Sequence, residues 1–441
     1  MRLAHFIQRY PPALGGAEAY FARLSRFCAG QGDAVTVFTS NALALEAFWS
    51  RGAACLPEGL DSDAGVAVRR FPLLRFPGRR YFLKALSLLP HPLWQCLTLP
   101  CNPIAPTLWR AAGTTVGFDA VHASAFPYAF PIVCGRRLAR RLGVPFFITP
   151  FLHLGNPDDP ADRTRRGYTS RALRWLLCEA DGVFVQTPTE RDAAIRLGVP
   201  AERVVLQGLG VEPAECTGGD RLAARERWNL PPDAVVVGHL ANQSWEKGTN
   251  DLLAALEPHF NQARPVHLLL AGPRMPNFAR FWTDFQSRCP AAQTRVRQLG
   301  VVTDAQKRDF YAAIDVFALP SRSDSFGLVL LEAWANGVPN VAYRAGGIAD
   351  VIRDGRDGLL ATCGDIERLS TALAKLMEEN GLRERLGKAG QNRLPAEFCW
   401  GDRLSLVRQT IAEHIERKKN PNRASCKNAA YLATDASVRV I

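Results

Sequence analysis

The chain has 441 residues, of which 47% are hydrophobic and 22% charged, and these values are typical of a soluble globular protein with two or three domains. The formal net charge of +12 indicates an anionic partner, but no zinc finger or other nucleic-acid-reading module is recognisable, so we do not expect nucleic acid. No run approaches the roughly 18 apolar residues that span a bilayer, and no signal-peptide pattern opens the chain, so we expect a cytoplasmic protein.

The first half of the chain alternates short apolar segments with helical ones. Residues 2–8 and 34–40 are predicted strands around a helix over 17–32, and such a β-α-β unit favours a parallel sheet. The loop before this helix ends in Gly15-Gly16, which is either a phosphate-binding turn or a plain one. Further strands are predicted at 118–124, 145–151 and 180–187.

The second half repeats this alternation after a stretch rich in glycine and polar residues. Strands are predicted at 234–241, 266–272, 296–301, 316–321, 340–345 and 357–362, with final helices over 365–378, 380–391 and 400–417. The expected organisation is an N-terminal domain 1–205, a linker 206–230, a C-terminal domain 231–395, a helix 396–418 packing back on the first domain, and a mobile tail 419–441. We therefore predict two Rossmann-like, doubly wound parallel-sheet domains that face each other across a ligand-binding cleft.

A basic segment in the first half carries six cationic side chains and no acid between residues 65 and 85. They are Arg69, Arg70, Arg75, Arg79, Arg80 and Lys84, and large apolar residues stand between and after them as far as residue 109. This mixture is typical of a peripheral segment attracted to the anionic inner face of a membrane. A solvated basic face beside a proline-rich core loop explains the pattern equally well.

The residues that commonly hold metals form no convincing pattern. The eleven cysteines are scattered without a C-x-x-C pair, which favours reduced, buried thiols over disulfides or a zinc site. Asp61-Ser62-Asp63 imitates a metal-holding D-x-D motif, but it lies in a predicted loop without supporting context, and we interpret it as chance. No metal site is predicted.

The stretch 321–339, SRSDSFGLVLLEAWANGVP, places two acids eight positions apart at the start of an apolar helix. The helix is predicted to begin at Phe326 or Gly327 and to end at the Gly-Val-Pro sequence. At about 1.5 Å per residue, the carboxylates of Asp324 and Glu332 are separated by roughly 12 Å, which is too far for an acid–base dyad. The spacing suits the two ends of an elongated polar ligand, with the helix N-terminus between them.

Several stretches taken together resemble the retaining glycosyltransferases of family 4, which have the glycosyltransferase-B fold. The most specific is the run 313–360, which contains both acids. GHLANQSWEKGTNDLLAAL (238–256), LLLAGP and RVRQLGVV extend it in the second half, and PPALGGAEAYFARLSRFC, FDAVHAS and ADGVFVQTPTERD match in the first. The resemblance covers nearly the whole chain except 41–110 and the tail.

The resemblance implies a role for each matching position. Asp324, where Glu is usual, would contact the hydroxyls of the donor sugar, and Glu332 would bind the ribose of the nucleotide. Lys247 would neutralise the diphosphate, and His122, at a strand end, would meet the donor sugar unless it is a structural histidine. His122, Lys247 and Asp324 are thus the implied catalytic residues. The other implied positions are Gly15, Gly16, Ser325, Phe326, Gly327 and Leu328 for the substrate and Gly272, Gly300 and Val301 for the nucleotide.

Three positions depart from the family pattern. An Arg usually follows a Gly shortly before the lysine, but here Gly238 is followed by His239, and a neutral histidine substitutes poorly for a permanent cation. Arg274 is a candidate replacement, and His153 lies at another strand end. Besides the substitution at position 324, Asp350 also stands where Glu is usual.

The implied reaction transfers a hexosyl group from a nucleoside diphosphate sugar, UDP- or GDP-linked, to a hydroxyl acceptor in cell-surface glycan or glycolipid synthesis. No metal or cofactor is implied, since a lysine and a helix terminus would face the diphosphate and the sugar nucleotide is a co-substrate. The basic segment suggests a lipid-linked glycan as acceptor. The alternatives are a non-catalytic sugar-nucleotide-binding or scaffold protein, a sugar-nucleotide epimerase and a phosphorylase on the same fold.

Overall fold

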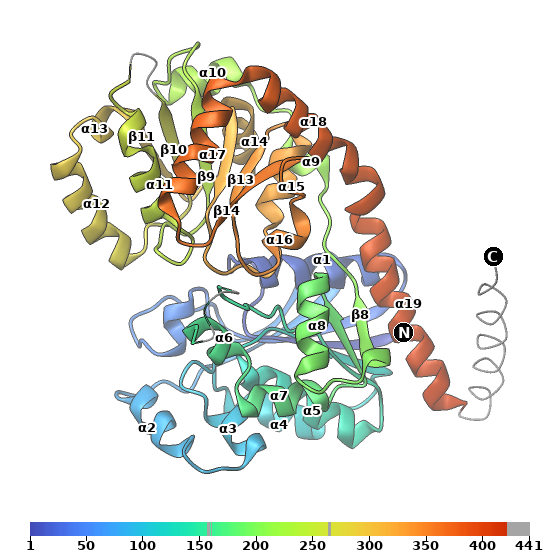
Figure 1. Ribbon diagram of the computed structural model, residues 1–441. Helices are drawn as coiled ribbons and strands as arrows, with labels where there is room; N and C mark the ends of the chain where they lie inside the picture. Colours follow the sequence, from blue (N-terminus) through green and yellow to red (C-terminus); the bar gives the residue numbers. More distant parts are fainter. Residues whose placement is uncertain (157–158, 160, 263–265, 421–441) are drawn as a thin grey trace, which may run out of the picture.

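The computed structural model describes residues 1–156, 159, 161–262 and 266–420, and it consists of two α/β domains (Figure 1). Each domain has one sheet of mainly parallel strands with helices on both faces, which confirms the predicted pair of Rossmann-like domains. Most of the predicted tail, residues 421–441, lies outside the described residues.

The sheet of the N-terminal domain has eight strands in the order β3-β4-β2-β1-β5-β6-β7-β8. The strands are β1 (Arg2–Ile7), β2 (Ala34–Ser40), β3 (Gly59–Asp63), β4 (Val66–Phe71), β5 (Ala120–Ala123), β6 (Phe146–Ile148), β7 (Gly182–Val185) and β8 (Val204–Leu206). The expected loop at Asp61 is therefore an edge strand, β3, which pairs antiparallel with β4. Asp63 accepts a hydrogen bond from the Tyr10 hydroxyl at 2.9 Å, so this acid has a structural role.

Helices cover both faces of this sheet. They are α1 (Gly16–Gly30), α2 (Arg79–Leu86), α3 (Pro92–Thr98), α4 (Pro106–Thr114), α5 (Ala129–Leu142), α6 (Arg163–Tyr168), α7 (Arg171–Cys178) and α8 (Pro188–Arg196), with short 3₁₀ turns η1 (Leu45–Phe48) and η2 (Ala201–Arg203). Helix α1 forms because its apolar residues recur at helical spacing. Tyr20, Phe21, Leu24 and Cys28 are all buried on the face that meets the sheet.

The sheet of the C-terminal domain has six strands in the order β11-β10-β9-β12-β13-β14, all paired in parallel. The strands are β9 (Val236–Leu240), β10 (His267–Ala271), β11 (Val296–Gly300), β12 (Val316–Leu319), β13 (Asn340–Arg344) and β14 (Gly358–Thr362). Every residue of β10 and β12 is buried, as expected for central strands with helices on both faces.

The helices of this domain begin inside the stretch that was predicted to be a linker. They are α9 (Pro213–Cys216), α10 (Arg221–Arg227), α11 (Thr249–Leu256), α12 (Pro276–Arg288), α13 (Ala292–Arg295), α14 (Asp304–Ala313), α15 (Leu328–Ala335), α16 (Ile348–Val351), α17 (Ile366–Glu378) and α18 (Asn380–Glu397), with the turn η3 (Glu257–His259). Arg225 on α10 reaches Asp315 at 2.8 Å, which ties this helix to the C-terminal domain.

The chain crosses between the domains twice, and the two crossings are bonded to each other. The N–H of Val211 donates to the carbonyl of Phe398 at 2.9 Å. Helix α19 (Trp400–Lys419) then runs back along the N-terminal domain (Figure 1) and contacts α1. Arg408 of α19 reaches the buried Asp33 at 2.7 Å, and the chain N-terminus binds the same carboxylate.

Candidate active site

Lys247 and Asp324 form an ion pair where β9 and β12 end, on the side of the C-terminal sheet that faces the other domain. The distance from Lys247 Nζ to Asp324 Oδ2 is 2.6 Å, and both side chains are mostly buried. Burial alone would raise the pKa of Asp324, but Lys247, together with His153, outweighs burial and holds this pKa below its usual value. The acid is therefore a carboxylate at neutral pH.

Two glycines hold the loop that carries Asp324. The N–H of Gly347 donates to the Asp324 carbonyl at 2.9 Å. A Cβ at Gly346 would overlap that same carbonyl, and a Cβ at Gly347 would overlap the carbonyl of Ser325. The Ala-Gly-Gly sequence thus permits a close approach of two backbones, which fixes the loop ahead of α15.

The loop leads into α15, which begins at Leu328, one residue after the later of the two predicted starts. Gly327 has φ +86°, a left-handed conformation that suits glycine. Phe326 is buried against Phe398, with ring centroids 6.1 Å apart, so its side chain anchors the loop. Just before the helix, the N–H of Phe326 donates to Asp324 Oδ1 at 3.3 Å.

Glu332 is held by two residues of α14. Lys307 Nζ lies 2.9 Å from Glu332 Oε1, and the Tyr311 hydroxyl donates to Oε2 at 2.8 Å. Burial raises the pKa of Tyr311, and the adjacent carboxylate raises it further, so the phenol stays protonated and acts as a donor. Both oxygens of Glu332 therefore have fixed directions and keep lone pairs for a ligand.

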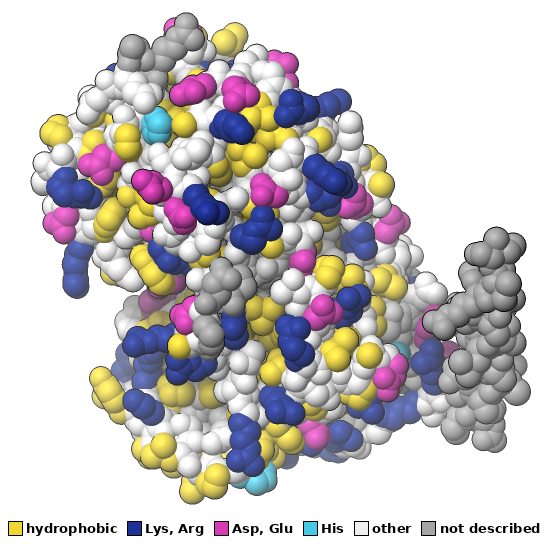
Figure 2. Space-filling model, in the orientation of Figure 1, with side chains coloured by type: hydrophobic (Ala, Val, Ile, Leu, Met, Phe, Trp, Pro, Cys, Tyr) yellow, Lys and Arg dark blue, Asp and Glu magenta, His cyan; other side chains and the backbone are white. Residues whose placement is uncertain are grey.

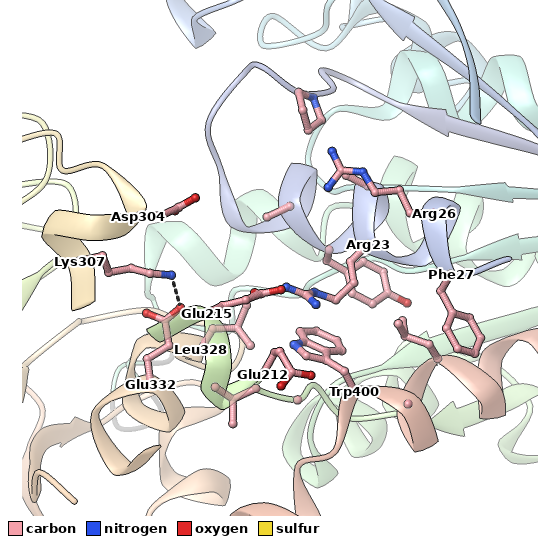
Figure 3. A pocket seen from close by; sticks show the side chains of 18 residues that line it. Arg23, Arg26, Phe27, Glu212, Glu215, Asp304, Lys307, Leu328, Glu332 and Trp400 are labelled. Carbon is pink, nitrogen blue, oxygen red and sulfur yellow. Dashed lines mark hydrogen bonds and ion pairs between the residues drawn. The ribbon is translucent and has the colours of Figure 1, made fainter. Parts of the chain in front are cut away.

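A cavity of about 730 Å³ adjoins Glu332 between the two domains (Figure 3). Lys307, Leu328 and Glu332 line it from the C-terminal domain, whereas Arg23 from α1 and Trp400 from α19 line the opposite side. This volume lies within the range of small-molecule sites.

The histidine next to the Lys247–Asp324 pair is His153 and not His122. His153 follows β6, and its pKa is lowered to about 4 by burial and by Lys247. Its ring lies 4.9 Å from that of Tyr168, and the N–H of Gly155 donates across the cleft to Ser323 Oγ at 3.3 Å. His153 is therefore a neutral side chain beside the loop that carries Asp324.

His122 lies in the core of the N-terminal domain, and this placement does not fit contact of its side chain with a ligand. Its ring packs against Phe21 of α1 and Phe184 of β7, and Nε2 lies 2.8 Å from Thr149 Oγ1. Burial lowers its pKa well below the usual value. These surroundings support the alternative that His122 is a structural histidine.

His239, at the position of the usual arginine, is also a buried structural residue. Its ring nitrogens lie 2.8 Å from the Ala318 carbonyl and 3.0 Å from Thr249 Oγ1. Burial lowers its pKa to about 4, so it provides no cation. The residues on either side of Arg274, Pro273 and Met275, form backbone hydrogen bonds with Gln243 in the loop that carries Lys247. The guanidinium of Arg274 itself donates to Gln298.

The remaining predicted positions lie at or near the ends of helices and strands. Gly15 precedes α1, and a Cβ there would overlap the carboxylate of Glu18, which forms a buried pair with Arg9. Asp350 accepts the N–H of Thr189 across the domains at 2.8 Å. Gly16, Gly272, Gly300 and Val301 lie at the start of α1 and at the ends of β10 and β11, and Val301 is exposed.

The described part of the chain contains neither a metal-binding cluster nor a helix that could span a membrane. No group of three or more His, Cys, Asp or Glu side chains is placed to hold a metal ion. None of the described helices combines the length and the apolarity needed to cross a membrane.

Two family models match the chain. The model described as glycosyl transferase 4-like domain matches residues 15–210, and the model described as glycosyl transferases group 1 matches residues 231–379. The chain belongs to the family 4 glycosyltransferases. It is 28% identical to the D-inositol 3-phosphate glycosyltransferase of Stackebrandtia nassauensis, over 92% of this chain and 88% of that one. It is also 34% identical to LpsE, a lipopolysaccharide core biosynthesis glycosyltransferase of Rhizobium meliloti, over 49% of this chain and 60% of that one.

Solved structures share the glycosyltransferase's fold. A sucrose-phosphate synthase from Thermosynechococcus elongatus superposes with a TM-score of 0.71 at 22% identity, over 93% of this chain and 99% of that one. HepE from Anabaena, in complex with UDP and glucose, has a TM-score of 0.71 at 19% identity, over 94% of this chain and 100% of that one.

Lys307 and Tyr311 contact Glu332, and His153 lies beside Asp324, but the sequence predicted no role for these three residues. Lys307 and Tyr311 are four residues apart, so they share one face of α14. This spacing was the one feature of the sequence that could have predicted that their side chains lie together. Together the site offers an ammonium and a helix N-terminus for anionic groups at one end, and an oriented carboxylate for hydroxyl groups at the other.

Proposed function

We propose that this glycosyltransferase moves a hexosyl group from a nucleoside diphosphate sugar to a hydroxyl acceptor, with retention of the anomeric configuration. The observation that carries the proposal is the arrangement of two acids around the start of α15. Asp324 is paired with Lys247, and Glu332 is held by Lys307 and Tyr311. An elongated ligand with a sugar at one end and a ribose at the other matches this order of groups. HepE, which shares the fold, has been crystallised with UDP-glucose, and this supports a nucleotide-sugar donor.

Each end of the donor would meet a different part of the site. The diphosphate would lie at the N-terminus of α15 beside Lys247, which stabilises the charge that develops on the departing nucleoside diphosphate. The ribose hydroxyls would donate to Glu332, and the base would extend toward Val301. This arrangement requires no metal ion and no cofactor.

The transfer would proceed by attack on the same face of the sugar that the diphosphate leaves. In this mechanism the leaving phosphate oxygen takes the proton of the acceptor hydroxyl. His153 and Asp324 would hold the sugar hydroxyls, and neutral His153 can accept or donate a hydrogen bond there without adding charge. A lipid-linked glycan at an anionic membrane is the acceptor that the composition of the N-terminal domain favours.

Thermal stabilisation by a panel of UDP-, GDP-, ADP- and TDP-sugars tests the donor. A ligand at 100 times its dissociation constant adds about 2.7 kcal/mol of stability. One sugar nucleotide should stabilise the wild type and fail to stabilise Glu332→Ala. The anomer first released when that donor is hydrolysed without acceptor, followed by NMR, tests retention. If no sugar nucleotide stabilises the folded protein, the proposed function is wrong.

A second candidate, a non-catalytic nucleotide-sugar-binding protein, is favoured by one observation. The position of the usual arginine holds the buried, neutral His239, so the diphosphate would meet one cation fewer. Nucleotide binding without transfer or hydrolysis would support this candidate. An epimerase would instead convert the donor sugar in the absence of acceptor.

A further inference from the structure

The basic segment of the N-terminal domain is divided by the structure into an internal part and an exposed part. Four of its five arginines are wholly or partly buried and have partners within the protein. Arg69 stacks on Phe38, Arg70 donates to the Pro11 carbonyl at 2.6 Å, Arg75 donates to the Ala53 carbonyl at 3.3 Å, and Arg79 is buried and donates to the Asn102 carbonyl at 2.9 Å. These four arginines stabilise the fold and do not form a charged outer surface.

The exposed part is an apolar tip on α2 and on the turn that follows it. Tyr81 is 82% exposed, Phe82 55%, Leu88 80% and Leu89 54%. Single exposed apolar residues are ordinary, but four large ones within nine positions form a patch that marks an interaction surface. We define Tyr81, Phe82, Leu88 and Leu89 as the α2 tip.

Hydrogen bonds from α3 hold the α2 tip in place. The Trp94 indole donates to the Leu86 carbonyl at 2.8 Å, and Gln95 donates to the Ser87 carbonyl at 3.1 Å. Helix α3, which carries both donors, packs on α7 through Cys96, whose thiol donates to the Ala172 carbonyl at 3.1 Å. The tip is thus a fixed projection, so docking it costs little ordering of the chain.

The charges of the sequence segment that carries the α2 tip have one sign. Arg80 and Lys84 are exposed on α2 itself, where Arg80 also stacks on Trp49, 4.9 Å from the ring centroid, and the sequence contains no acid between residues 64 and 118. Exposed Arg171 begins α7, against which α3 packs. Figure 2 shows Lys and Arg side chains gathered near hydrophobic ones over this end of the N-terminal domain, and Figure 1 shows α2 at its periphery.

We propose that the α2 tip inserts into the interfacial region of an anionic bilayer and attaches the protein peripherally to it. Aromatic and leucine side chains would enter the boundary between headgroups and acyl chains, while Arg80 and Lys84 would lie at the anionic headgroups. A projecting tip flanked by cations suits a bilayer better than a protein interface, whose core is usually depleted of lysine. Apolar insertion is the main contribution here, because most of the segment's arginines are internal.

Flotation with vesicles tests this attachment without requiring any transfer reaction. The full chain is mixed with vesicles of phosphatidylcholine alone, or of phosphatidylcholine with phosphatidylglycerol, and the floating fraction is measured. We expect the wild type to bind the anionic vesicles and Leu88→Ser/Leu89→Ser to bind them about tenfold more weakly. The matched control is Leu222→Ser on α10 of the other domain, because Leu222 is 74% exposed and should be neutral.

A second pair of variants tests the charges. Arg80→Gln/Lys84→Gln should weaken binding to anionic vesicles and lose the sensitivity of that binding to salt, whereas Lys375→Gln on α17 should change neither. The melting temperature and the stabilisation by UDP should match the wild type in every variant, which separates loss of attachment from misfolding and from failure of the proposed function.

Three outcomes would overturn the attachment. The wild type could fail to float with either vesicle, or Leu88→Ser/Leu89→Ser could float as well as the wild type. Light scattering could also show a wild-type dimer that Leu88→Ser/Leu89→Ser dissociates, without any vesicle binding. That third result would assign the α2 tip to a second copy of the chain.

Discussion

The Nζ of Lys247 lies 2.6 Å from Oδ2 of Asp324, so the cation expected at the donor diphosphate and the acid expected at the donor sugar are bonded to each other. The pair links the ends of β9 and β12, two adjacent strands of the C-terminal sheet. A donor that binds here would exchange this contact for phosphate on one side and sugar hydroxyls on the other. Both groups are therefore pre-oriented and charged before the donor arrives.

Removing the charge of Lys247 should slow transfer more than it weakens donor binding. We expect Lys247→Met to lower kcat by about 10²–10³-fold, the usual cost of losing one group that stabilises developing charge. Lys247→Arg keeps the charge and should retain much of the activity. Initial rates with the donor found by thermal stabilisation check this. Equal losses in both variants would mean that the lysine acts through shape and not through charge.

Loss of Lys307 should weaken the binding of nucleotide. Lys307→Met frees one oxygen of Glu332 and lets its carboxylate turn, so we expect the dissociation constant for the cognate nucleoside diphosphate to rise about tenfold. Tyr311→Phe should act in the same direction through the other oxygen. Calorimetric titration measures both effects, with the surface variant Lys388→Met as control. An unchanged affinity in the first two variants would remove Glu332 from the ribose site.

The two histidines at strand ends should differ when each is replaced by glutamine. His153→Gln should lower kcat and leave the melting temperature near that of the wild type, because His153 lies beside Asp324 at the cleft. His122→Gln should instead cost about 2 kcal/mol of stability, since it disturbs packing with Phe21 and Phe184. Its folded fraction should keep the wild-type kcat. The reverse pattern would restore His122 to the active site.

Restoring the arginine of the family pattern should harm this protein. His239→Arg would place a charge where both ring nitrogens of a neutral histidine are now bonded, so we expect a loss of about 3 kcal/mol or more. Denaturant unfolding measures the loss. A stable and more active His239→Arg variant would show instead that the pocket opens to the diphosphate.

Glu190 should make stability depend on pH. Burial raises its pKa from 4.5 to about 7, although the N–H groups of Leu152 and Gln186 oppose this. Because the folded pKa is the higher one, the stability it contributes is fully present below pH 4.5 and is lost as pH rises through 7. Relative to Glu190→Gln, the wild type should lose up to about 3 kcal/mol across this range. Unfolding free energies at a series of pH values test this, and parallel curves for the two proteins would contradict it.

The alternation of apolar and helical segments was sufficient to predict the two-domain fold, because each parallel strand must be followed by a crossover helix. The acids around α15 were found because they are close in sequence, but only Glu332 lies on the helix, whereas Asp324 lies in the loop before Leu328, so the helical rise applies to only part of their spacing. Contacts within one element or one turn could thus be predicted from spacing.

Contacts between elements could not be predicted in this way. His122 and His153 both follow apolar runs, and only tertiary packing decides that the first is enclosed against Phe21 while the second lies beside Lys247 and Asp324. Likewise, Arg70 and Arg79 resembled lipid-facing cations, but carbonyl groups distant in sequence bind them. A sequence gives the charge of a side chain and not the direction in which it points.

The hydrogen bond between Val211 and Phe398 places a pivot where the two crossings meet. A body that rotates about an axis moves least close to that axis. Phe326 packs on Phe398 and so lies near the pivot, whereas Val301 follows β11 at the far edge of the C-terminal sheet (Figure 1). A small change of interdomain angle would therefore swing the β11 edge of the C-terminal sheet through a wide arc and leave the loop that carries Asp324 almost stationary.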